Sequence, residues 1–328
     1  MKRRVLISGI NGQDGSYLTD FLLDKDYEIY GLLRRSSHTA TDRLRHCLDR
    51  IRLIPGDVTD QSSLMRAVKL ADPHEVYNFA AMSYVAHSFE APISTMEITG
   101  GGTVKLLEAV RHHAPHARFY QASSSEQFGN AEMSLQTEET PFRPISPYGC
   151  AKTYAHNMCS TYRVAYNMFI CCGIAYNHES PRRGEEFVTR KITKAIAQIK
   201  AGKQDVLKLG DTAARRDWSH AKDIVRGAWL SLQRDVPDDY VFASGQSHSV
   251  QEFVELAFNY AGLDHHQYVK IDPILFRPTE VHLLQGLSFK ATQLLGWKPT
   301  VTFSQLIQEM VEADLSATVE HRNPFEVR

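Results

Sequence analysis

The sequence lacks excess charge and long apolar runs, and each absence argues against a class of partner. Its 37 Lys and Arg residues are balanced by 38 Asp and Glu residues, so there is no bulk positive charge to attract nucleic acid or an anionic membrane. No segment approaches the roughly 20 apolar residues of a membrane-spanning helix. We therefore expect a small-molecule ligand, with neither nucleic acid nor membrane as a partner.

Cysteine is also scarce. The five cysteines are an odd number, and Cys171 and Cys172 are adjacent in an apolar, strand-like run, which suits reduced and buried thiols better than disulfides. The basic start is followed by an apolar run that breaks at once on glycine, unlike a signal peptide. The paired histidines at 112–113 and 265–266 do not form a recognisable metal motif. These patterns predict a cytoplasmic protein without a metal site.

The N-terminal stretch has the order strand, glycine turn, helix. Val5–Ser8 is a short apolar strand, and Tyr17–Leu23 has helical spacing. Glycines permit a tight turn and close backbone approach, and the N-terminus of the helix presents N–H groups and a positive dipole end to a pyrophosphate. We expect a dinucleotide here, bound by Gly9, Asn11, Gly12, Gln13, Asp14 and Gly15.

The residues that follow the next expected strand, Glu28–Leu33, indicate which dinucleotide binds. An NAD-preferring site places a carboxylate after this strand to bind the ribose 2′-hydroxyl, but this chain has Arg34, Arg35 and Ser36. Two arginines would instead pair with a 2′-phosphate, so the sequence predicts NADP, with an exposed basic loop as the alternative. Further cofactor contacts are expected after the third and fourth strands, at Asp57, Val58, Ala80 and Ala81.

A third stretch combines hydroxyl, carboxylate, phenol and ammonium groups. Tyr148 and Lys152 are one helical turn apart, so they share a helix face, and an ammonium there would favour the phenolate. A tyrosine in that environment can act as a base near neutral pH. The preceding Ser-Pro suits a helix entry, and an upstream strand delivers Ser124 and Glu126. The alternative is a surface Tyr and a solvated Lys that share a helix face by chance.

From Gly9 to about Asp314 the chain resembles the GDP-mannose 4,6-dehydratases, a branch of the extended short-chain dehydrogenase/reductases. The runs that carry the resemblance are 12–18, 34–37, 177–184, 187–191, 216–218 and 277–280. The resemblance implies an α/β fold, a Rossmann-type doubly wound parallel sheet with a smaller, mixed C-terminal substrate domain. Because residues 176–184 are polar and turn-rich, we assign residues 1–178, with a return segment near 212–245, to the NADP-binding domain. Residues 179–211 and 246–328 are assigned to the sugar-nucleotide domain.

The resemblance also implies a reaction, the conversion of a GDP-hexose, first of all GDP-D-mannose, to its 4-keto-6-deoxy product. In that reaction Tyr148 takes the C4 hydroxyl proton while hydride passes from C4 to NADP⁺, and Lys152 lowers the pKa of Tyr148. Glu126 then removes the C5 proton, water leaves from C6, and the hydride returns to C6. Ser124 hydrogen-bonds the C4 oxygen.

Other site residues are implied by the same resemblance. Cofactor contacts would also include Ser83, Tyr148, Lys152, His178 and Arg183. Substrate contacts would be Ser83, Ser124, Glu126, Asn177, Val188, Lys191, Arg216, Arg277 and Glu280. For each arginine a structural ion pair remains an alternative. A homodimer or homotetramer is implied as well, with the loop 35–43 and the turn at 182–183 at a subunit contact.

Two departures from the family pattern leave the sugar open. Ser124 stands where Thr is usual, and Met82 stands where Gln is common. The same dehydration of GDP-D-glycero-D-manno-heptose is therefore an alternative, as is a GDP-sugar reductase or epimerase, against which Glu126 argues. A non-catalytic NADP sensor is a further alternative, but it would not need Ser124, Glu126, Tyr148 and Lys152 together.

Overall fold

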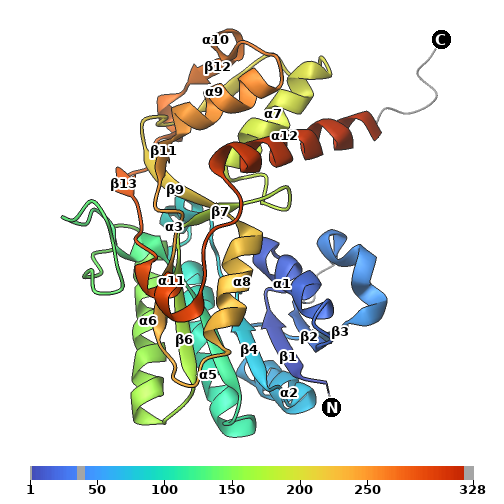
Figure 1. Cartoon of the computed structure of the whole chain (residues 1–328), viewed down its shortest axis with the longest axis vertical. Helices are drawn as coiled ribbons and strands as arrows, with labels where there is room; N and C mark the ends of the chain where they lie inside the picture. Colours follow the sequence, from blue (N-terminus) through green and yellow to red (C-terminus); the bar gives the residue numbers. More distant parts are fainter. Residues whose placement is uncertain (1, 35–40, 321–328) are drawn as a thin grey trace.

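The computed structural model describes residues 2–34 and 41–320, which form two lobes (Figure 1). The lower lobe in the figure surrounds a large parallel sheet. The upper lobe consists of three longer helices and several short strands. Because the chain passes between the lobes more than once, residues far apart in sequence meet where the lobes join.

The large sheet has seven strands in the order β10-β6-β5-β4-β1-β2-β3. Every neighbouring pair is parallel, and the Val- and Ile-rich strands are buried on both faces, as expected for a sheet with helices on each side. The strands are β1 (Arg4–Ser8), β2 (Glu28–Leu33), β3 (Arg52–Pro55), β4 (Glu75–Asn78), β5 (Arg118–Ser124), β6 (Ile170–Ala175) and β10 (Asp239–Phe242). The strand order reverses between β1 and β4, so the predicted Rossmann-type doubly wound sheet is confirmed.

Helices cover both faces of this sheet. Against one face pack α1 (Gln13–Leu23) and α8 (Ala221–Ser231), and against the other pack α2 (Gln61–Ala71), α5 (Gly102–His113) and α6 (Pro147–Ala165). Shorter elements complete the lobe: η1 (Asp42–Arg50), α3 (Val85–Glu90), α4 (Pro92–Thr95), η2 (Met96–Gly101), η3 (Ser125–Gln127) and α11 (Phe289–Leu295).

The helix expected from Thr95 to Ala114 is not regular at its start. Residues 96–101 form a π-helical turn, η2, and the α-helix α5 begins only at Gly102. A Cβ on Gly102 would lie 2.9 Å from the Cβ of Val58, so glycine allows the helix to approach the loop after β3. Glycines also have low helix propensity, which accounts for the irregular first turn.

The upper lobe has its own core and a small mixed sheet. Helices α7 (Val188–Lys200), α9 (Val250–Tyr260) and α12 (Phe303–Glu320) enclose a cluster in which Trp218 stacks on Phe303 with ring centres 5.6 Å apart. Strand β9 (Arg215–His220) pairs with β7 (Asn177–Glu179), β11 (Ser247–Ser249) and β13 (Leu283–Leu284). The remaining elements are β8 (Leu207–Leu209), α10 (His265–Tyr268), β12 (Val269–Ile271) and η4 (Pro273–Leu275).

The returning chain joins the lower lobe later than residue 212. Because Trp218 packs in the upper core, β9 belongs to the small sheet, and the large sheet is rejoined by α8 and β10. The junction is fastened by buried Asp217, whose carboxylate accepts hydrogen bonds from the backbone N–H groups of Ser244 (2.7 Å), Gly245 (2.9 Å) and Gly286 (3.3 Å). One carboxylate therefore holds three chain segments together where the lobes meet.

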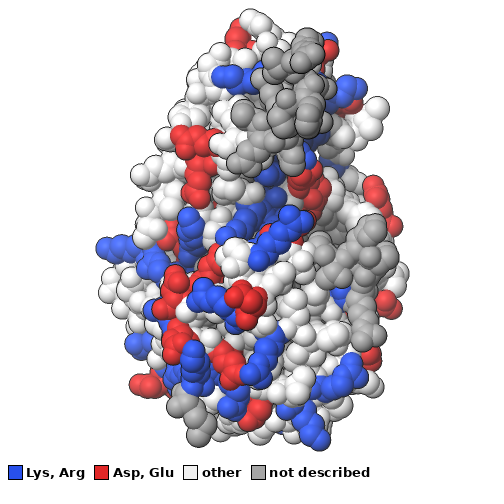
Figure 2. Space-filling view, turned by 90° about the vertical axis from the view of Figure 1, so that its right-hand side faces the viewer, with Lys and Arg blue, Asp and Glu red and all other residues white. Residues whose placement is uncertain are grey.

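On the face seen in Figure 2, Lys and Arg side chains are interspersed with Asp and Glu, as the balanced composition leads one to expect. Among the described residues, none of the helices combines the length and the apolar character needed to cross a bilayer.

Candidate active site

The glycine turn after β1 is shaped by close backbone contacts. Gly9 has φ +69°, and a Cβ there would lie 2.9 Å from the Ala80 backbone nitrogen. A Cβ on Gly15 would lie 2.3 Å from the Gly9 carbonyl oxygen. Gly12 forms the N-cap of α1 without a capping side chain, so the first N–H groups of that helix remain available to an anion. The turn therefore has the backbone shape that dinucleotide binding requires.

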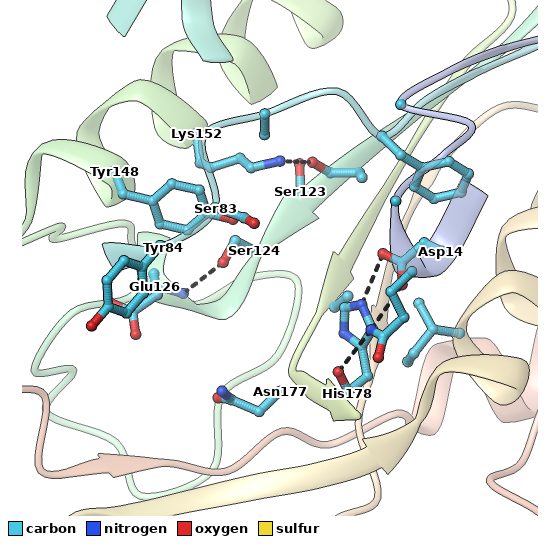
Figure 3. Close-up of a pocket in the computed structure, with 18 of the residues that line it drawn as sticks. Asp14, Ser83, Tyr84, Ser123, Ser124, Glu126, Tyr148, Lys152, Asn177 and His178 are labelled. Carbon is cyan, nitrogen blue, oxygen red and sulfur yellow. Dashed lines mark hydrogen bonds and ion pairs between the residues drawn. The ribbon is translucent and has the colours of Figure 1, made fainter. Parts of the chain in front are cut away.

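A pocket opens from this turn towards the upper lobe, and it gathers most of the residues expected from the sequence (Figure 3). Tyr148, Lys152 and Ser83 lie on the same side as Ser124 and Glu126, and Asp14 and His178 lie on the other side. The expected residues that line it are Gly9, Asn11, Gly12, Gln13, Asp14, Gly15, Ala80, Ala81, Ser83, Ser124, Glu126, Tyr148, Lys152, Asn177, His178, Arg183, Arg216 and Arg277.

Ser124 and Glu126 enter this pocket from the C-terminal end of β5. The Ser124 hydroxyl accepts a hydrogen bond from the Glu126 backbone N–H (3.3 Å), and the Ser124 backbone N–H donates to the Gln127 side chain (2.8 Å). This reciprocal cap forces the chain into the turn η3 directly after the strand. Glu126 is thereby placed in the turn directly after Ser124, where its residue is only 8% exposed.

Tyr148 and Lys152 lie on the first two turns of α6, which starts with a Ser146 cap and Pro147. Burial raises the pKa of Tyr148 to about 12, opposed by a hydrogen bond with Ser124. Burial lowers the pKa of Lys152 to about 8, so the charged ammonium form still predominates at pH 7. The Lys152 ammonium donates to the Ala122 carbonyl oxygen (2.6 Å) and lies 5.7 Å from the centre of the Tyr148 ring. The two side chains thus share one wall of the pocket.

On the opposite wall, Asp14 and His178 bind each other. Their Oδ2 and Nε2 atoms are 2.9 Å apart, and the other ring nitrogen of His178 is 2.7 Å from the Tyr176 carbonyl oxygen. With Asp14 ionised, both partner atoms accept, and this geometry favours a His178 that carries a proton on each ring nitrogen. Burial opposes that charge, but Asp14 raises the pKa of His178 above its usual value. Next to this pair, Gln13 donates to the His178 carbonyl oxygen (3.1 Å) and accepts from the Ser180 hydroxyl (2.7 Å). These contacts link the start of α1 to β7 and to the segment that follows it.

Two arginines of that segment are held by ion pairs. Arg182 pairs with Asp20 (2.7 Å), while Arg183 pairs with Glu179 (3.0 Å) and stacks on the Phe187 ring at 3.5 Å. Both arginines therefore have structural ion-pair partners. Arg183 also lines the pocket, so it can meet a ligand without giving up its partner.

A second pocket lies beside the first, in the upper lobe. Asn177, Val188, Lys191, Arg216, Arg277 and Glu280 line it. Arg216 donates to Glu280 (2.5 Å) and to the Val281 carbonyl oxygen (2.6 Å), and Arg277 donates to the same Glu280 oxygen at 3.4 Å. Glu280 thus orients two guanidinium groups towards one place. Lys191 brings the cations of this pocket to three, and Glu186 and Asp211 also line it, so cations and carboxylates are equal in number. The two guanidinium groups beside Glu280 are the part of the pocket that suits a diphosphate.

Arg34 and Asp57 lie apart from both pockets, in a shallower one at the ends of β2 and β3. Arg66 of α2 lines it as well, although its sequence context did not mark it as a binding residue. Val58, expected beside the adenine, is buried against Gly102. Arg35 and Ser36, expected at the 2′-phosphate, lie outside the described residues.

The described residues fit a dinucleotide. At Gly9 and Gly15 there is no room for a Cβ, so the backbone of the turn lies close to its neighbours. Helix α1 begins without a capping side chain, and the residues after β4 that line the pocket, Ala80 and Ala81, have small side chains. Arg43, the last residue of the loop expected at a subunit contact, donates within the chain to the carbonyl oxygens of Asn11 (3.2 Å) and Arg182 (2.8 Å). That contact joins segments far apart in sequence, so spacing gives no signal for it.

Comparison with known proteins shows the family of this chain. A family model described as GDP-mannose 4,6 dehydratase matches residues 6–310. GDP-mannose 4,6 dehydratase 1 of Arabidopsis thaliana is 49% identical over 326 residues, covering 96% of this chain and 90% of the relative. The GDP-mannose 4,6 dehydratase of Homo sapiens is 44% identical, covering 94% and 91%. A UDP-glucose 4-epimerase of Thermotoga maritima, solved with UDP-glucose, shares the fold with a TM-score of 0.85 at 22% identity, covering 95% of this chain and 99% of that one. The chain belongs to the GDP-mannose 4,6-dehydratase family.

Proposed function

We propose that this chain converts GDP-D-mannose to its 4-keto-6-deoxy product by oxidation at C4, loss of water across C5 and C6, and reduction at C6. The observation that carries the proposal is the buried Glu126 carboxylate, which lies in one pocket with Ser124, Tyr148 and Lys152. A simple alcohol dehydrogenase needs only the last three groups. The additional carboxylate is what a second proton transfer requires.

Each of these side chains handles a proton at a defined atom. The Tyr148 phenol oxygen takes the proton from the C4 hydroxyl, and the Ser124 hydroxyl holds the C4 oxygen. The charged Lys152 ammonium favours the phenolate against the effect of burial, which is the main reason that the pKa of Tyr148 is raised. Glu126 takes the C5 proton, made acidic by the C4 ketone, and assists departure of the C6 hydroxyl. A nicotinamide dinucleotide held at the glycine turn supplies the chemistry of hydride acceptance and return.

The second pocket binds the diphosphate of the nucleotide. Lys191, Arg216 and Arg277 are the cations for the diphosphate, and Asn177 lies on the border of both pockets. Glu280 holds the two arginine side chains in place, so little of their conformational entropy has to be lost when the substrate binds. Binding energy from this remote part of the substrate can then orient the sugar over Tyr148 and Glu126.

We further propose NADP as the dinucleotide. Support comes from Arg34, which directly follows β2 at the place where NAD-binding chains carry an acid, and from Arg66 in the same shallow pocket. Two guanidinium groups there favour a 2′-phosphate.

A homodimer or homotetramer and a cytoplasmic location also belong to the proposal. All five cysteines are free, as expected for a reducing compartment. Light scattering of the active, NADP-loaded protein tests the assembly, and a monomeric mass would contradict it.

Substitution of Glu126 by Gln tests the reaction most directly. The variant keeps the size of the side chain but loses the base, so formation of the 4-keto-6-deoxy product should fall about 10²- to 10⁴-fold, while oxidation at C4 remains. Glu139→Gln, an exposed acid in the loop after β5, is the matched control. Tyr148→Phe should block C4 oxidation as well. GDP-mannose and GDP-mannoheptose are assayed side by side, and products are identified by mass and NMR.

The outcomes separate the possible activities. In D₂O the wild-type product should carry deuterium at C5, and hydrogen at C6 should come from C4 of the same sugar. Wild-type rates in Glu126→Gln, or net accumulation of NADPH without loss of water, would refute the dehydration and favour a reductase or epimerase.

A further inference from the structure

Tyr84 lies at the border between the two pockets, in a stretch of chain whose neighbouring pocket residues are small. It follows β4 in the run 79–85, from which Ala80, Ala81 and Ser83 also line the first pocket. Of these four residues, Tyr84 alone lines the second pocket as well. A large aromatic side chain is therefore placed where the pocket of the acid-base residues continues into the pocket of the arginines.

The backbone of Tyr84 is held by the lower lobe. Tyr84 is the N-cap residue of α3, with extended backbone angles (φ −80°, ψ 103°), and the next residue, Val85, is buried. Helix α3 packs against α6, the helix that carries Tyr148. Figure 3 shows Tyr84 on the side of the pocket that carries Tyr148 and Glu126. The position of Tyr84 relative to the proposed acid-base residues is thus set within one lobe.

The ring of Tyr84 is supported from the upper lobe. It meets the ring of Phe187 at an angle of 72°, with ring centres 5.7 Å apart, which is the edge-to-face arrangement that aromatic pairs prefer. Phe187 is the N-cap residue of α7, and the Arg183 guanidinium lies 3.5 Å from the centre of its ring. Arg183 is in turn paired with the buried Glu179. The Tyr84 ring therefore rests on a side chain that is itself held in place.

Contact with Phe187 leaves part of the Tyr84 side chain uncovered. Tyr84 is 38% exposed, whereas Tyr77 and Tyr120, which pack in the core beneath the pocket, are 0% exposed. An aromatic residue that only joined the two lobes would be covered in the same way. Because Tyr84 lines both pockets, its uncovered surface is available to a ligand that occupies them.

The substrate of the proposed reaction has to place its hexosyl group at this border. Arg216 and Arg277 bind the diphosphate, while Tyr148 and Glu126 act on C4 and C5, so the sugar ring lies between these two sets of side chains. A hexose ring is uncharged and presents C–H groups on its faces. Such a face can pack against an aromatic ring, and tyrosine combines a large apolar body with a polar end. Tyr84 thus has the chemistry that suits a sugar.

We propose that Tyr84 binds the hexosyl group of the substrate through its ring, with Phe187 as the positioning residue that holds this ring. The inference rests on the proposed function and adds to it a residue that orients the sugar. Orientation of C4 and C5 towards their reacting partners is a large part of what a binding site contributes to catalysis. Because the ring makes the contact, the hydroxyl of Tyr84 is not required.

The first test compares two ligands, GDP-mannose and GDP, by calorimetry on the full chain loaded with NADPH, in which C4 cannot be oxidised. Tyr84→Ala should weaken the binding of GDP-mannose about 10-fold and leave the binding of GDP unchanged. Tyr84→Phe keeps the ring and should bind both ligands as the wild type does. Tyr154→Ala is the matched control, because Tyr154 is 46% exposed but lines neither pocket.

The second test measures turnover of GDP-mannose. Tyr84→Ala should lower kcat about 10²-fold, since the sugar is no longer held over the acid-base residues. Phe187→Ala should lower kcat in the same direction, and Phe187→Tyr, which keeps the ring, should restore it. The double variant should be no slower than Tyr84→Ala alone, because Phe187 acts through Tyr84. Tyr84→Leu, which keeps apolar bulk without the ring, repeats both tests if the alanine variant does not fold.

The proposal is overturned by wild-type affinity for GDP-mannose in Tyr84→Ala, by equal losses of affinity for GDP and GDP-mannose, or by a Tyr84→Phe variant as impaired as Tyr84→Ala. Wild-type protein that does not bind GDP-mannose would overturn it as well. Failure of the proposed function gives a different result. Wild-type protein that binds GDP-mannose without dehydrating it refutes the reaction, while the comparison of the two ligands still decides the role of Tyr84.

Discussion

The ion pair between Asp14 and His178 leads to a quantitative prediction about stability. Its side chains are 19% and 14% exposed, and the pair joins the first turn of α1 to β7, elements 164 residues apart. Replacing His178 by Asn removes the imidazolium and leaves the Asp14 carboxylate without its charge partner in a largely buried position. Breaking a buried pair from one side typically costs about 3–5 kcal/mol of unfolding free energy.

The chain contains a matched control for this experiment. His46 and Asp20 form a pair of the same chemistry, 2.6 Å apart, but the His46 side chain is 52% exposed. An exposed pair of this kind contributes about 0–1 kcal/mol. His46→Asn should therefore lower the unfolding free energy much less than His178→Asn, although both substitutions are identical in chemistry.

The effect of His178→Asn should also depend on pH. Burial opposes the charge on His178, but Asp14 raises its pKa above the usual 6.5. The contribution of His178 is thus complete below about pH 6.5 and is lost as pH rises through the raised folded-state pKa. Burial alone would raise the pKa of Asp14, but His178 lowers it below the usual 3.8, so its contribution is lost only as pH falls below that value. The difference between wild type and variant should be largest between about pH 4 and 6.5.

Urea unfolding of both variants and the wild type, without added nucleotide and at several pH values, measures these differences. A cost for His178→Asn no larger than that for His46→Asn, or a cost that increases steadily above pH 7, would show that His178 is not held as an imidazolium by Asp14.

Three further predictions concern ligand binding and catalysis. Gly15→Ala should abolish dinucleotide binding in calorimetry, since its Cβ would lie 2.3 Å from the Gly9 oxygen, whereas Gly101→Ala, with 3.8 Å to its nearest neighbour, should bind normally. Arg34→Ala should weaken NADP binding by about 1.5–3 kcal/mol, roughly 10- to 150-fold, and leave NAD binding unchanged; equal effects on both would contradict the assigned 2′-phosphate contact. Lys152→Met should slow single-turnover oxidation at C4 about 10²-fold or more, because the phenolate loses its cation, and a wild-type rate would remove Lys152 from the mechanism.

Local patterns predicted the parts of this protein that depend on local geometry. The glycine turn needs Gly9 and Gly15 because neighbouring backbone atoms leave no room for a Cβ. This requirement can be recognised from the local sequence alone. Tyr148 and Lys152 share a wall of the pocket because helical periodicity puts them there.

Contacts between distant segments could not be predicted in the same way. The sequence indicates that Asp14 follows a glycine turn, but not that it binds His178 rather than remaining free for a ligand. It indicates cations at Arg216 and Arg277, but not that Glu280 accepts from both. Such partners are chosen by tertiary packing, for which spacing along the chain carries no signal. The same reason explains why Trp218 was expected with the lower lobe but packs in the upper one.

The late position of β10 in the chain has a consequence for how the protein can be synthesised. The large sheet lacks its last strand until residue 242 has been made, and Phe242 is in turn covered by Trp297, with ring centres 5.1 Å apart. During translation, β6 therefore remains an open edge while α7, β8 and β9 of the upper lobe are being added. Open edges of apolar strands invite pairing with other chains. The large sheet is thus completed only after the first elements of the upper lobe have been made, and Trp297 covers Phe242 later still.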